Sequence, residues 1–147
     1  MEAINPANGE TIGEYEEHDD REVEGRLERA ARAAQTWRRR DIDERAVRMN
    51  ALADHLRDHQ REYAELMTRE MGKPIDQAEG EVEKCAWVCE HYAERAEEYL
   101  EPTEIETDAD ESRVQYEPLG PVFAIMPWNF PFWQVFRFAA PNLMDGN

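Results

Sequence analysis

Two prolines, Pro127 and Pro131, restrict the backbone on both sides of a single amide side chain, that of Asn129. The apolar run at 122–126 comes just before them, and its continuous hydrophobicity is typical of a strand buried on both faces of a parallel sheet. A helix is predicted over 132–144, packing back onto that strand. The sequence therefore predicts an α/β fold in which a rigid loop between strand and helix presents Asn129.

The rest of the chain is predicted to be rich in helix. Asp19 and Asp41 each stand three residues before a glutamate and are the expected N-caps of two helices, with Glu22 as the reciprocal partner of Asp19. Gly72 and Pro74 should end the second helix. The predicted elements are a hairpin at 4–15 with a two-residue turn at Asn8-Gly9, helices at 23–37, 42–71 and 75–100, and a hairpin at 104–116.

The charge of the chain excludes two classes of partner. With 34 acidic and 17 basic residues in 147, the formal net charge is -17, which opposes binding to nucleic acid or to an anionic membrane. Lys73 and Lys84 are the only lysines. This acid-rich, lysine-poor composition suggests a salt-adapted, halophilic protein, with an ordinary acidic protein as the alternative. No apolar stretch reaches the length of a membrane span and no leader sequence is recognisable, so we expect a cytoplasmic protein.

The motif at 127–131, proline-tryptophan-asparagine-phenylalanine-proline, strongly resembles the aldehyde dehydrogenase superfamily. In that family the asparagine of this motif helps to form the oxyanion hole, so the resemblance implies a catalytic role for Asn129. Considered alone, Asn129 could also cap a loop. The resemblance extends over nearly the whole chain, from Asn5-Pro6 to Gly146-Asn147. It departs at Asp145, where the family usually has alanine, and this puts the local packing in doubt.

The resemblance also implies a cofactor, NAD or NADP. Met126, Pro127 and Trp128 would line the path of the dinucleotide at the carboxyl end of the strand, which is where ligands sit in open α/β sheets. No Gly-x-Gly-x-x-Gly run is present, and the superfamily does without one. Without the family resemblance, Met126 and Trp128 could be packing residues. The sequence does not distinguish NAD from NADP.

Arg137 points to the class of substrate. It lies in an otherwise apolar helical segment, where its guanidinium must either find a partner or extend to solvent. In the succinate-semialdehyde branch of the family, which the chain resembles at 129–137 and 81–89, an arginine at this offset contacts the substrate carboxylate. A structural salt bridge is the alternative. Phe130 and Trp133 would form apolar walls of the aldehyde tunnel, or else pack in the core.

Other residues that attract attention are not expected to form a site. Cys85 and Cys89 lie on the inward face of a predicted helix without a cation to lower a thiol pKa, so we expect buried, unreactive thiols. His55 and His59 are four residues apart, but no third ligand can be assigned, so no metal site is expected. The carboxylates fall on outer helical faces or in turns, which does not favour a paired-carboxylate acid–base site.

The resemblance implies the fold of the N-terminal part of an aldehyde dehydrogenase: a Rossmann-like cofactor domain, incomplete here, with hairpins. Residues 1–101 would hold its N-terminal hairpin and helices, and 102–118 a hairpin of the oligomerisation domain. Residues 119–147 would hold the first strand, the oxyanion loop and a helix.

The expected function is that of an N-terminal fragment of an NAD(P)-dependent oxidoreductase. It would oxidise a small aldehyde, succinate semialdehyde or a similar carboxylate-bearing one, and form a homo-oligomer when full length. The nucleophilic cysteine and the general base would lie beyond Asn147, so the fragment alone should be inactive. The alternative from another class is a non-catalytic acidic helical scaffold or partner-binding module.

Overall fold

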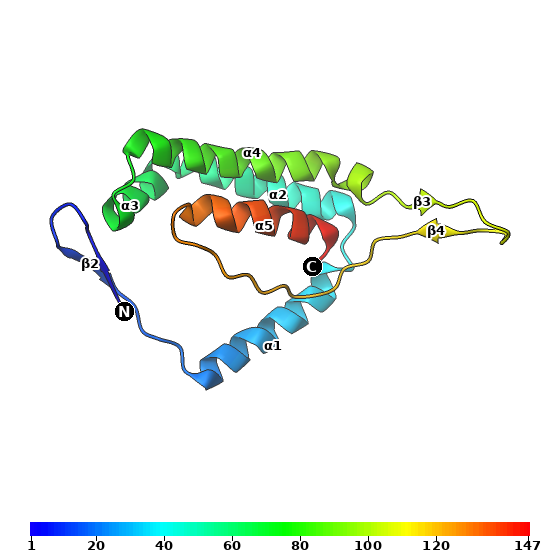
Figure 1. The fold of residues 1–147 in the computed structure, drawn as a ribbon, viewed down its shortest axis with the longest axis horizontal. Coiled ribbons are helices and arrows are strands. Elements are labelled where there is room, and N and C mark those ends of the chain that lie inside the picture. The colour runs from blue at the N-terminus through cyan, green and yellow to red at the C-terminus, as the bar shows by residue number, and fades with distance from the viewer.

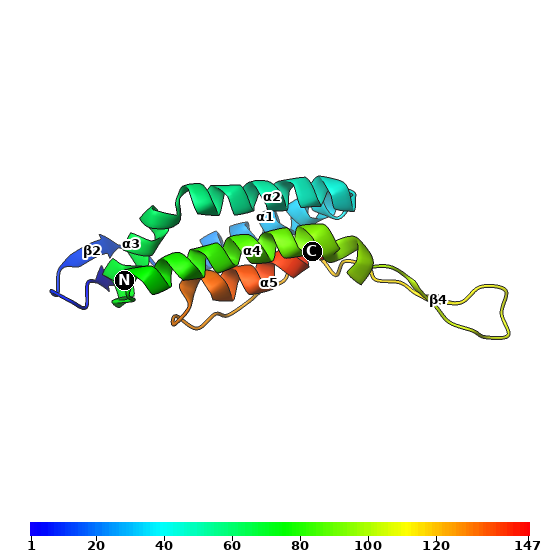
Figure 2. The same ribbon diagram turned by 90° about the horizontal axis from the view of Figure 1, so that it is seen from above.

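The computed structural model describes residues 1–147, and helices dominate it (Figure 1). Three long helices, α2, α4 and α5, lie side by side in two perpendicular views, while α1 approaches them only at its C-terminal end (Figures 1 and 2). Two antiparallel hairpins, β1–β2 and β3–β4, lie at opposite ends of the molecule. The helices are α1 (Asp20–Trp37), α2 (Ile42–Asp58), α3 (Gln60–Met71), α4 (Ile75–Tyr99) and α5 (Pro131–Asp145). The prediction of a helix-rich chain with two hairpins is confirmed.

Local capping explains where the helices begin and end. The Asp19 carboxylate accepts a hydrogen bond from the Glu22 backbone N–H at 2.8 Å, and Asp41 accepts one from Glu44 at 2.7 Å, as predicted. The Glu22 side chain does not complete a capping box, because it pairs with Arg26 at 2.7 Å instead. Gly72 ends α3 with a φ of 74°, a left-handed conformation that glycine adopts without strain.

The single helix predicted over 42–71 is divided in two. His59 leaves the helical conformation, with φ -111° and ψ 13°, so α2 ends at Asp58 and α3 begins at Gln60. The His59 ring Nδ1 and the His55 carbonyl oxygen are 2.9 Å apart, so the ring lies over the end of α2. Neither glycine nor proline marks this break, which is why helical periodicity alone missed it.

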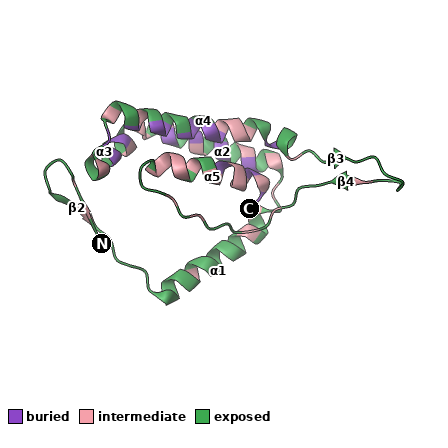
Figure 3. Ribbon diagram, in the orientation of Figure 1, coloured by how far each residue is buried: buried purple, intermediate pink, exposed green.

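The core lies along α4, between α2 and α5 (Figure 3). Its most enclosed residues are small or medium in size, which lets the helices approach closely. α1 contributes no buried residue. The core residues are Met49, Ala53, Leu56, Ala64, Met67, Ala78, Val82, Cys85, Ala86, Val88, Cys89, Ala96, Ala140 and Met144.

Both hairpins have short strands, of two to four residues. Strands β1 (Glu2–Ile4) and β2 (Thr11–Glu14) pair with Ile4 opposite Thr11, so a six-residue loop joins them. The prediction of a two-residue Asn8-Gly9 turn is therefore wrong, although Gly9 does adopt a positive φ of 76°. Strands β3 (Thr103–Glu104) and β4 (Arg113–Val114) form a two-residue ladder whose four residues are all exposed.

The apolar run at 122–126 does not form a strand in this structure. It is extended, but neither of the two-stranded sheets includes it, and Phe123 and Ile125 are 82% and 86% exposed. A β-strand depends on hydrogen bonds to a neighbouring strand, and none of the four strands lies beside this run. Within these residues the predicted burial of the run on both faces is therefore wrong. No helix of the structure is both long enough and apolar enough to cross a membrane.

Candidate active site

The loop that carries Asn129 connects the extended run to the first turn of α5. Residues 128–130 form a turn, Pro131 is the first residue of α5, and the fixed φ of proline suits that position. Asn129 is exposed, and its side chain has no hydrogen-bond partner among residues 1–147. Its amide N–H groups are therefore free to donate to a ligand.

Two hollows flank this loop, and they divide the predicted site residues between them. One, of about 620 Å³, is formed by the extended run and one face of α5, and Met126, Pro127 and Arg137 line it together. The other, of about 320 Å³, lies between α4 and the start of α5, and Phe130 and Trp133 line it. The structure thus brings the first three residues together and the last two together.

Asn129 and Trp128 line neither hollow. The indole of Trp128 is 77% exposed, which leaves its ring free. The predicted substrate residues Phe130, Trp133 and Arg137 do not share one cavity within residues 1–147, because Arg137 faces the other side of α5 from the two aromatic rings.

Arg137 is exposed and forms no ion pair with any of the residues in the structure. The sequence predicted that its guanidinium would either find a partner or extend to solvent, and in the structure it extends to solvent. The structural salt bridge considered as an alternative has no partner in residues 1–147. The cation is free to meet an anionic group in the hollow that it shares with Met126 and Pro127.

Two residues that sequence reasoning missed lie directly behind the loop. Glu81 of α4 is almost fully buried, with 3% of its side chain exposed, and its Oε2 pairs with Lys73 Nζ. Its other oxygen, Oε1, accepts hydrogen bonds from the backbone N–H groups of Phe132 at 3.0 Å and Trp133 at 2.9 Å. The sequence did hold a signal, because Glu81 falls between Ala78 and Cys85 on the inward stripe of α4.

Both lysines of the chain contact aromatic rings of the same segment. Lys73 Nζ lies 4.2 Å from the centroid of the Phe130 ring, and Lys84 Nζ lies 3.9 Å from that of Trp133. These distances are well within the range of cation–π attraction. The ring faces that were predicted to line an aldehyde tunnel therefore contact ammonium groups of α4 and of the turn before it.

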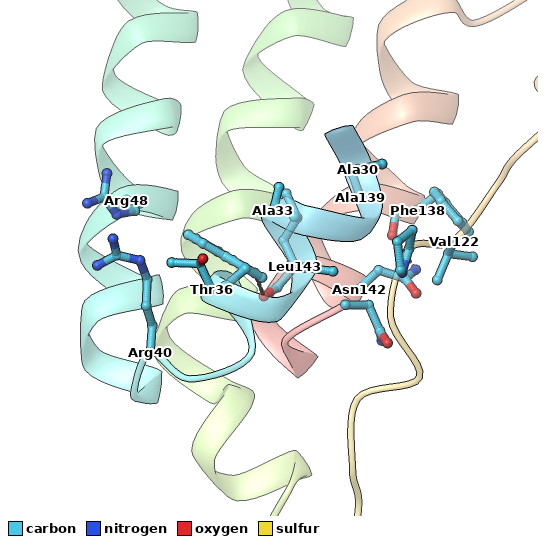
Figure 4. Close-up of a pocket in the computed structure, with 14 residues that line it drawn as sticks. Ala30, Ala33, Thr36, Arg40, Arg48, Val122, Phe138, Ala139, Asn142 and Leu143 are labelled. Carbon is cyan, nitrogen blue, oxygen red and sulfur yellow. Dashed lines mark hydrogen bonds between the residues drawn. The ribbon is translucent and has the colours of Figure 1, made fainter. Parts of the chain in front are cut away.

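A third hollow, of about 660 Å³, lies elsewhere, between α1 and the C-terminal half of α5 (Figure 4). Ala30 and Ala33 line one side of it, and Phe138 and Leu143 line another. Trp37 Nε1 donates a hydrogen bond to the Leu143 carbonyl oxygen at 2.8 Å and ties the two helices together. This hollow contains none of the predicted site residues and no cysteine, so it is not the candidate active site.

Comparison with known proteins decides the family. Residues 1–147 match the model of the aldehyde dehydrogenase family over their whole length. The chain belongs to the aldehyde dehydrogenase family. The resemblance found in the loop motif is thereby confirmed for the whole chain.

The relatives cover the chain, but the chain covers only part of them. It is 50% identical over 144 residues to a probable succinate-semialdehyde dehydrogenase (NADP+) of Synechocystis sp., spanning 98% of this chain and 32% of the relative. It is 43% identical over 147 residues to the succinate semialdehyde dehydrogenase (NAD(P)+) Sad of Escherichia coli, spanning 99% and 31%. The chain therefore spans about a third of the length of these curated relatives.

A solved structure supports the same conclusion for the fold. The chain superposes with a TM-score of 0.94 on the succinic semialdehyde dehydrogenase of Streptococcus pyogenes, whose crystal structure is a complex with NADP+. The two are 36% identical, and the match covers 99% of this chain and 32% of the other. The fold described above is thus that of part of an aldehyde dehydrogenase.

The two cysteines of this aldehyde dehydrogenase chain are buried thiols, as predicted. Cys85 and Cys89 are both 0% exposed. Burial, reinforced by the negative charge of Glu81, raises the pKa of Cys85 to about 12, and burial together with Glu90 raises the pKa of Cys89 to about 12. Neither thiol can act as a nucleophile at neutral pH.

Alkylation should test this directly. At about pH 8, a pKa near 12 leaves on the order of one thiol in 10,000 ionised, so iodoacetamide should not label Cys85 or Cys89 in the native protein. Mass spectrometry of the α4 peptide measures the labelling. The same peptide should be fully labelled in urea, and rapid labelling of the native protein would contradict the burial of these thiols.

The histidine pair of this chain has local partners. The His55 and His59 ring centroids are 4.1 Å apart, and His55 Nε2 is hydrogen-bonded to the Tyr63 hydroxyl at 2.9 Å. No group of three or more histidine, cysteine, aspartate or glutamate side chains stands close enough to hold a metal ion. The histidines therefore belong to the packing between α2 and α3.

Proposed function

We propose that this chain is the N-terminal part of an NAD(P)-dependent aldehyde dehydrogenase that oxidises succinate semialdehyde or a similar carboxylate-bearing aldehyde to the acid. The observation that carries the proposal is the unpartnered amide of Asn129 on a proline-bracketed loop, in a chain that belongs to the aldehyde dehydrogenase family. The fragment alone is inactive in this proposal, because it lacks a reactive thiol.

Asn129 acts as the oxyanion donor in the proposed mechanism. When a thiolate attacks the aldehyde carbon, negative charge develops on the carbonyl oxygen, and a preorganised side-chain amide at that point is worth about 3 to 4 kcal/mol. The flanking prolines restrict the loop before substrate arrives, so little reorganisation is needed. The buried Cys85 and Cys89 cannot supply the thiolate, which must come from a residue outside these 147.

The cofactor proposed for this chain is NADP, with NAD as a second possibility. The relatives support this choice, because the Synechocystis protein is named for NADP+, the Escherichia coli protein for NAD(P)+, and the Streptococcus pyogenes enzyme was crystallised with NADP+. When bound, the cofactor accepts the hydride from the substrate. Met126, Pro127 and Trp128 fit a planar heteroaromatic group, because the first two line an open hollow and the third exposes its ring.

Arg137 is the residue proposed to bind the substrate carboxylate. Its guanidinium is unpaired and exposed, and a planar guanidinium can donate two parallel hydrogen bonds to a carboxylate. Phe130 and Trp133 are the proposed apolar walls of the aldehyde tunnel, although in residues 1–147 they line a different hollow from Arg137, on the other side of α5. The names of the relatives agree with a substrate that carries a carboxylate.

We also propose that the full-length protein works in a salt-adapted cytosol and forms a homo-oligomer. The net charge of -17 supports both solubility at high salt and the absence of nucleic-acid or membrane partners. The projecting β3–β4 hairpin supports oligomerisation, because Ile105 and Val114 are exposed on it, 45% and 48% respectively.

An assay of the full-length protein that contains these residues tests the proposal. We expect NADPH to form when succinate semialdehyde and NADP+ are supplied together, and to form much more slowly with butanal, which lacks the carboxylate. The 147-residue chain alone should give none. If the full-length protein forms no reduced cofactor with any aldehyde, the proposed function is wrong.

A further inference from the structure

Helix α5 begins without a cap of its own. Its N-cap residue, Phe130, has no side-chain acceptor, although the first N–H groups of a helix have no partner within the helix. Glu81 of α4 supplies the missing acceptor, because its Oε1 lies 3.0 Å from the Phe132 nitrogen and 2.9 Å from the Trp133 nitrogen. A carboxylate at this end also interacts favourably with the helix dipole. The start of α5 is therefore held by a residue about 50 positions earlier in the chain.

Glu81 is itself held in place by Lys73. The ammonium of Lys73 pairs with Glu81 Oε2, and both residues are less than 9% exposed. The backbone on either side of Lys73 is constrained, since Gly72 adopts a left-handed conformation and Pro74 has a fixed φ. Lys73 also lies over the ring of Phe130. The pair therefore contacts residues 130, 132 and 133, immediately after Asn129.

We propose that Glu81, together with Lys73, is a positioning residue for the oxyanion donor Asn129. It does not touch the substrate; it fixes the first turn of α5 and the Phe130 ring, and through them the loop on which Asn129 stands. A misplacement of a catalytic group by about 1 Å can cost about 100-fold in rate. This inference rests on the proposed function of Asn129, and it assigns a catalytic purpose to a buried ion pair that otherwise would be purely structural.

The substitution Glu81→Gln removes one of the two required acceptors with little change of volume. A carboxamide has only one oxygen. The NH2 group of the glutamine, which is a donor, must therefore face either the N–H groups of α5 or the Lys73 ammonium, both of which are also donors. In the full-length enzyme we expect kcat to fall about 10- to 100-fold, while KM for NADP+ stays within about twofold. Glu94→Gln is the matched control, because it makes the same change at an exposed position of the same helix, and it should alter neither value.

The decisive measurement is a double-mutant cycle with Asn129→Ala. If Glu81 acts through Asn129, the substitution Glu81→Gln should lower kcat by less than about twofold once the amide is absent. A loss of the same factor in both backgrounds would overturn the inference and leave Glu81 structural. If the unsubstituted enzyme is inactive, or if Asn129→Ala alone leaves kcat unchanged, the proposed function itself is wrong. This outcome differs from equal losses in the two backgrounds, which would contradict only the role of Glu81.

A second pair of variants keeps the test open if Glu81→Gln does not fold. Lys73→Met combined with Glu81→Gln leaves a carbonyl oxygen free for the N–H groups of α5, whereas Lys73→Met combined with Glu81→Leu leaves none. Neither pair retains a buried charge. We expect kcat of the Lys73→Met, Glu81→Gln enzyme to stay within about threefold of that of the Lys73→Met enzyme. The kcat of the Lys73→Met, Glu81→Leu enzyme should fall about 10-fold or more relative to the same reference, and this fall should occur only when Asn129 is present. Equal kcat values for the two pairs would overturn the inference.

Discussion

Replacing Asn129 by alanine is expected to lower kcat of the full-length enzyme about 100- to 1,000-fold, while KM for NADP+ changes by less than about twofold. The physical reason is that the amide donates to an oxygen whose charge grows only as the transition state forms, so its loss falls on the chemical step. Steady-state kinetics with succinate semialdehyde measure both values. In the structure the side chain is exposed and unpaired, so alanine should not unfold the loop.

Two further variants sharpen this prediction. Asn129→Asp keeps the size of the side chain but replaces the donor by a negatively charged acceptor, so its kcat should be no higher than that of Asn129→Ala. Asn50→Ala removes an exposed asparagine from α2, far from the loop in sequence, and should leave kcat unchanged. A kcat for Asn129→Ala close to that of the unsubstituted enzyme would reject the oxyanion role.

The features that the sequence predicted well are those set within a few residues. Asp19 and Asp41 cap helices because their acceptors lie three residues from the N–H groups that they satisfy. Gly72 ends α3 because a left-handed residue is needed at one position. The alternation of apolar and charged residues in α4 placed Cys85 and Cys89 inside the core correctly. Each of these signals is local, so no knowledge of the tertiary structure is required.

The features that were missed depend on partners far along the chain. The run at 122–126 has the composition of a buried strand, but a strand forms only beside another, and none is adjacent here. Glu81 was not singled out as a functional residue, yet it caps a helix that begins 50 residues later. The break at His59 carries no glycine or proline, and the α3 that follows it packs against α4, a partner that local sequence does not reveal.

The candidate site likewise combines features that are set by adjacent residues with features that depend on distant parts of the chain. Asn129 could be singled out because its flanking prolines are adjacent, and the loop geometry follows from them. The grouping of Met126 and Pro127 with Arg137, and of Phe130 with Trp133, depends on the two sides of α5 facing different hollows. The position of Glu81 on the inward stripe of α4 is visible in the sequence, but its pairing with Lys73 and its hydrogen bonds to the start of α5 could be recognised only from tertiary structure.

The second large effect is expected at Arg137. In the full-length enzyme Arg137→Ala should raise KM for succinate semialdehyde about 10- to 100-fold, because a hydrogen-bonded charge contact is worth about 1.5 to 3 kcal/mol. KM for butanal should change by less than about twofold, since that substrate has no carboxylate to lose. Steady-state kinetics with the two aldehydes measure how much more the substitution raises KM for succinate semialdehyde than KM for butanal. The unpaired state of Arg137 in the structure argues that its removal breaks no internal ion pair.

Two control variants separate the contact from the general effect of charge. Arg48→Ala removes another arginine that is exposed and unpaired, on α2, and so makes the same change to a chain whose net charge is already -17. Any rise in KM that it shares with Arg137→Ala reflects long-range repulsion of an anionic substrate and should vanish at high salt. Arg137→Lys keeps the charge without the planar fork, so its KM should lie between those of the unsubstituted enzyme and Arg137→Ala. Equal effects of Arg137→Ala on succinate semialdehyde and butanal would instead make Arg137 a structural residue, and the choice of a carboxylate-bearing substrate would lose its support in this part of the chain.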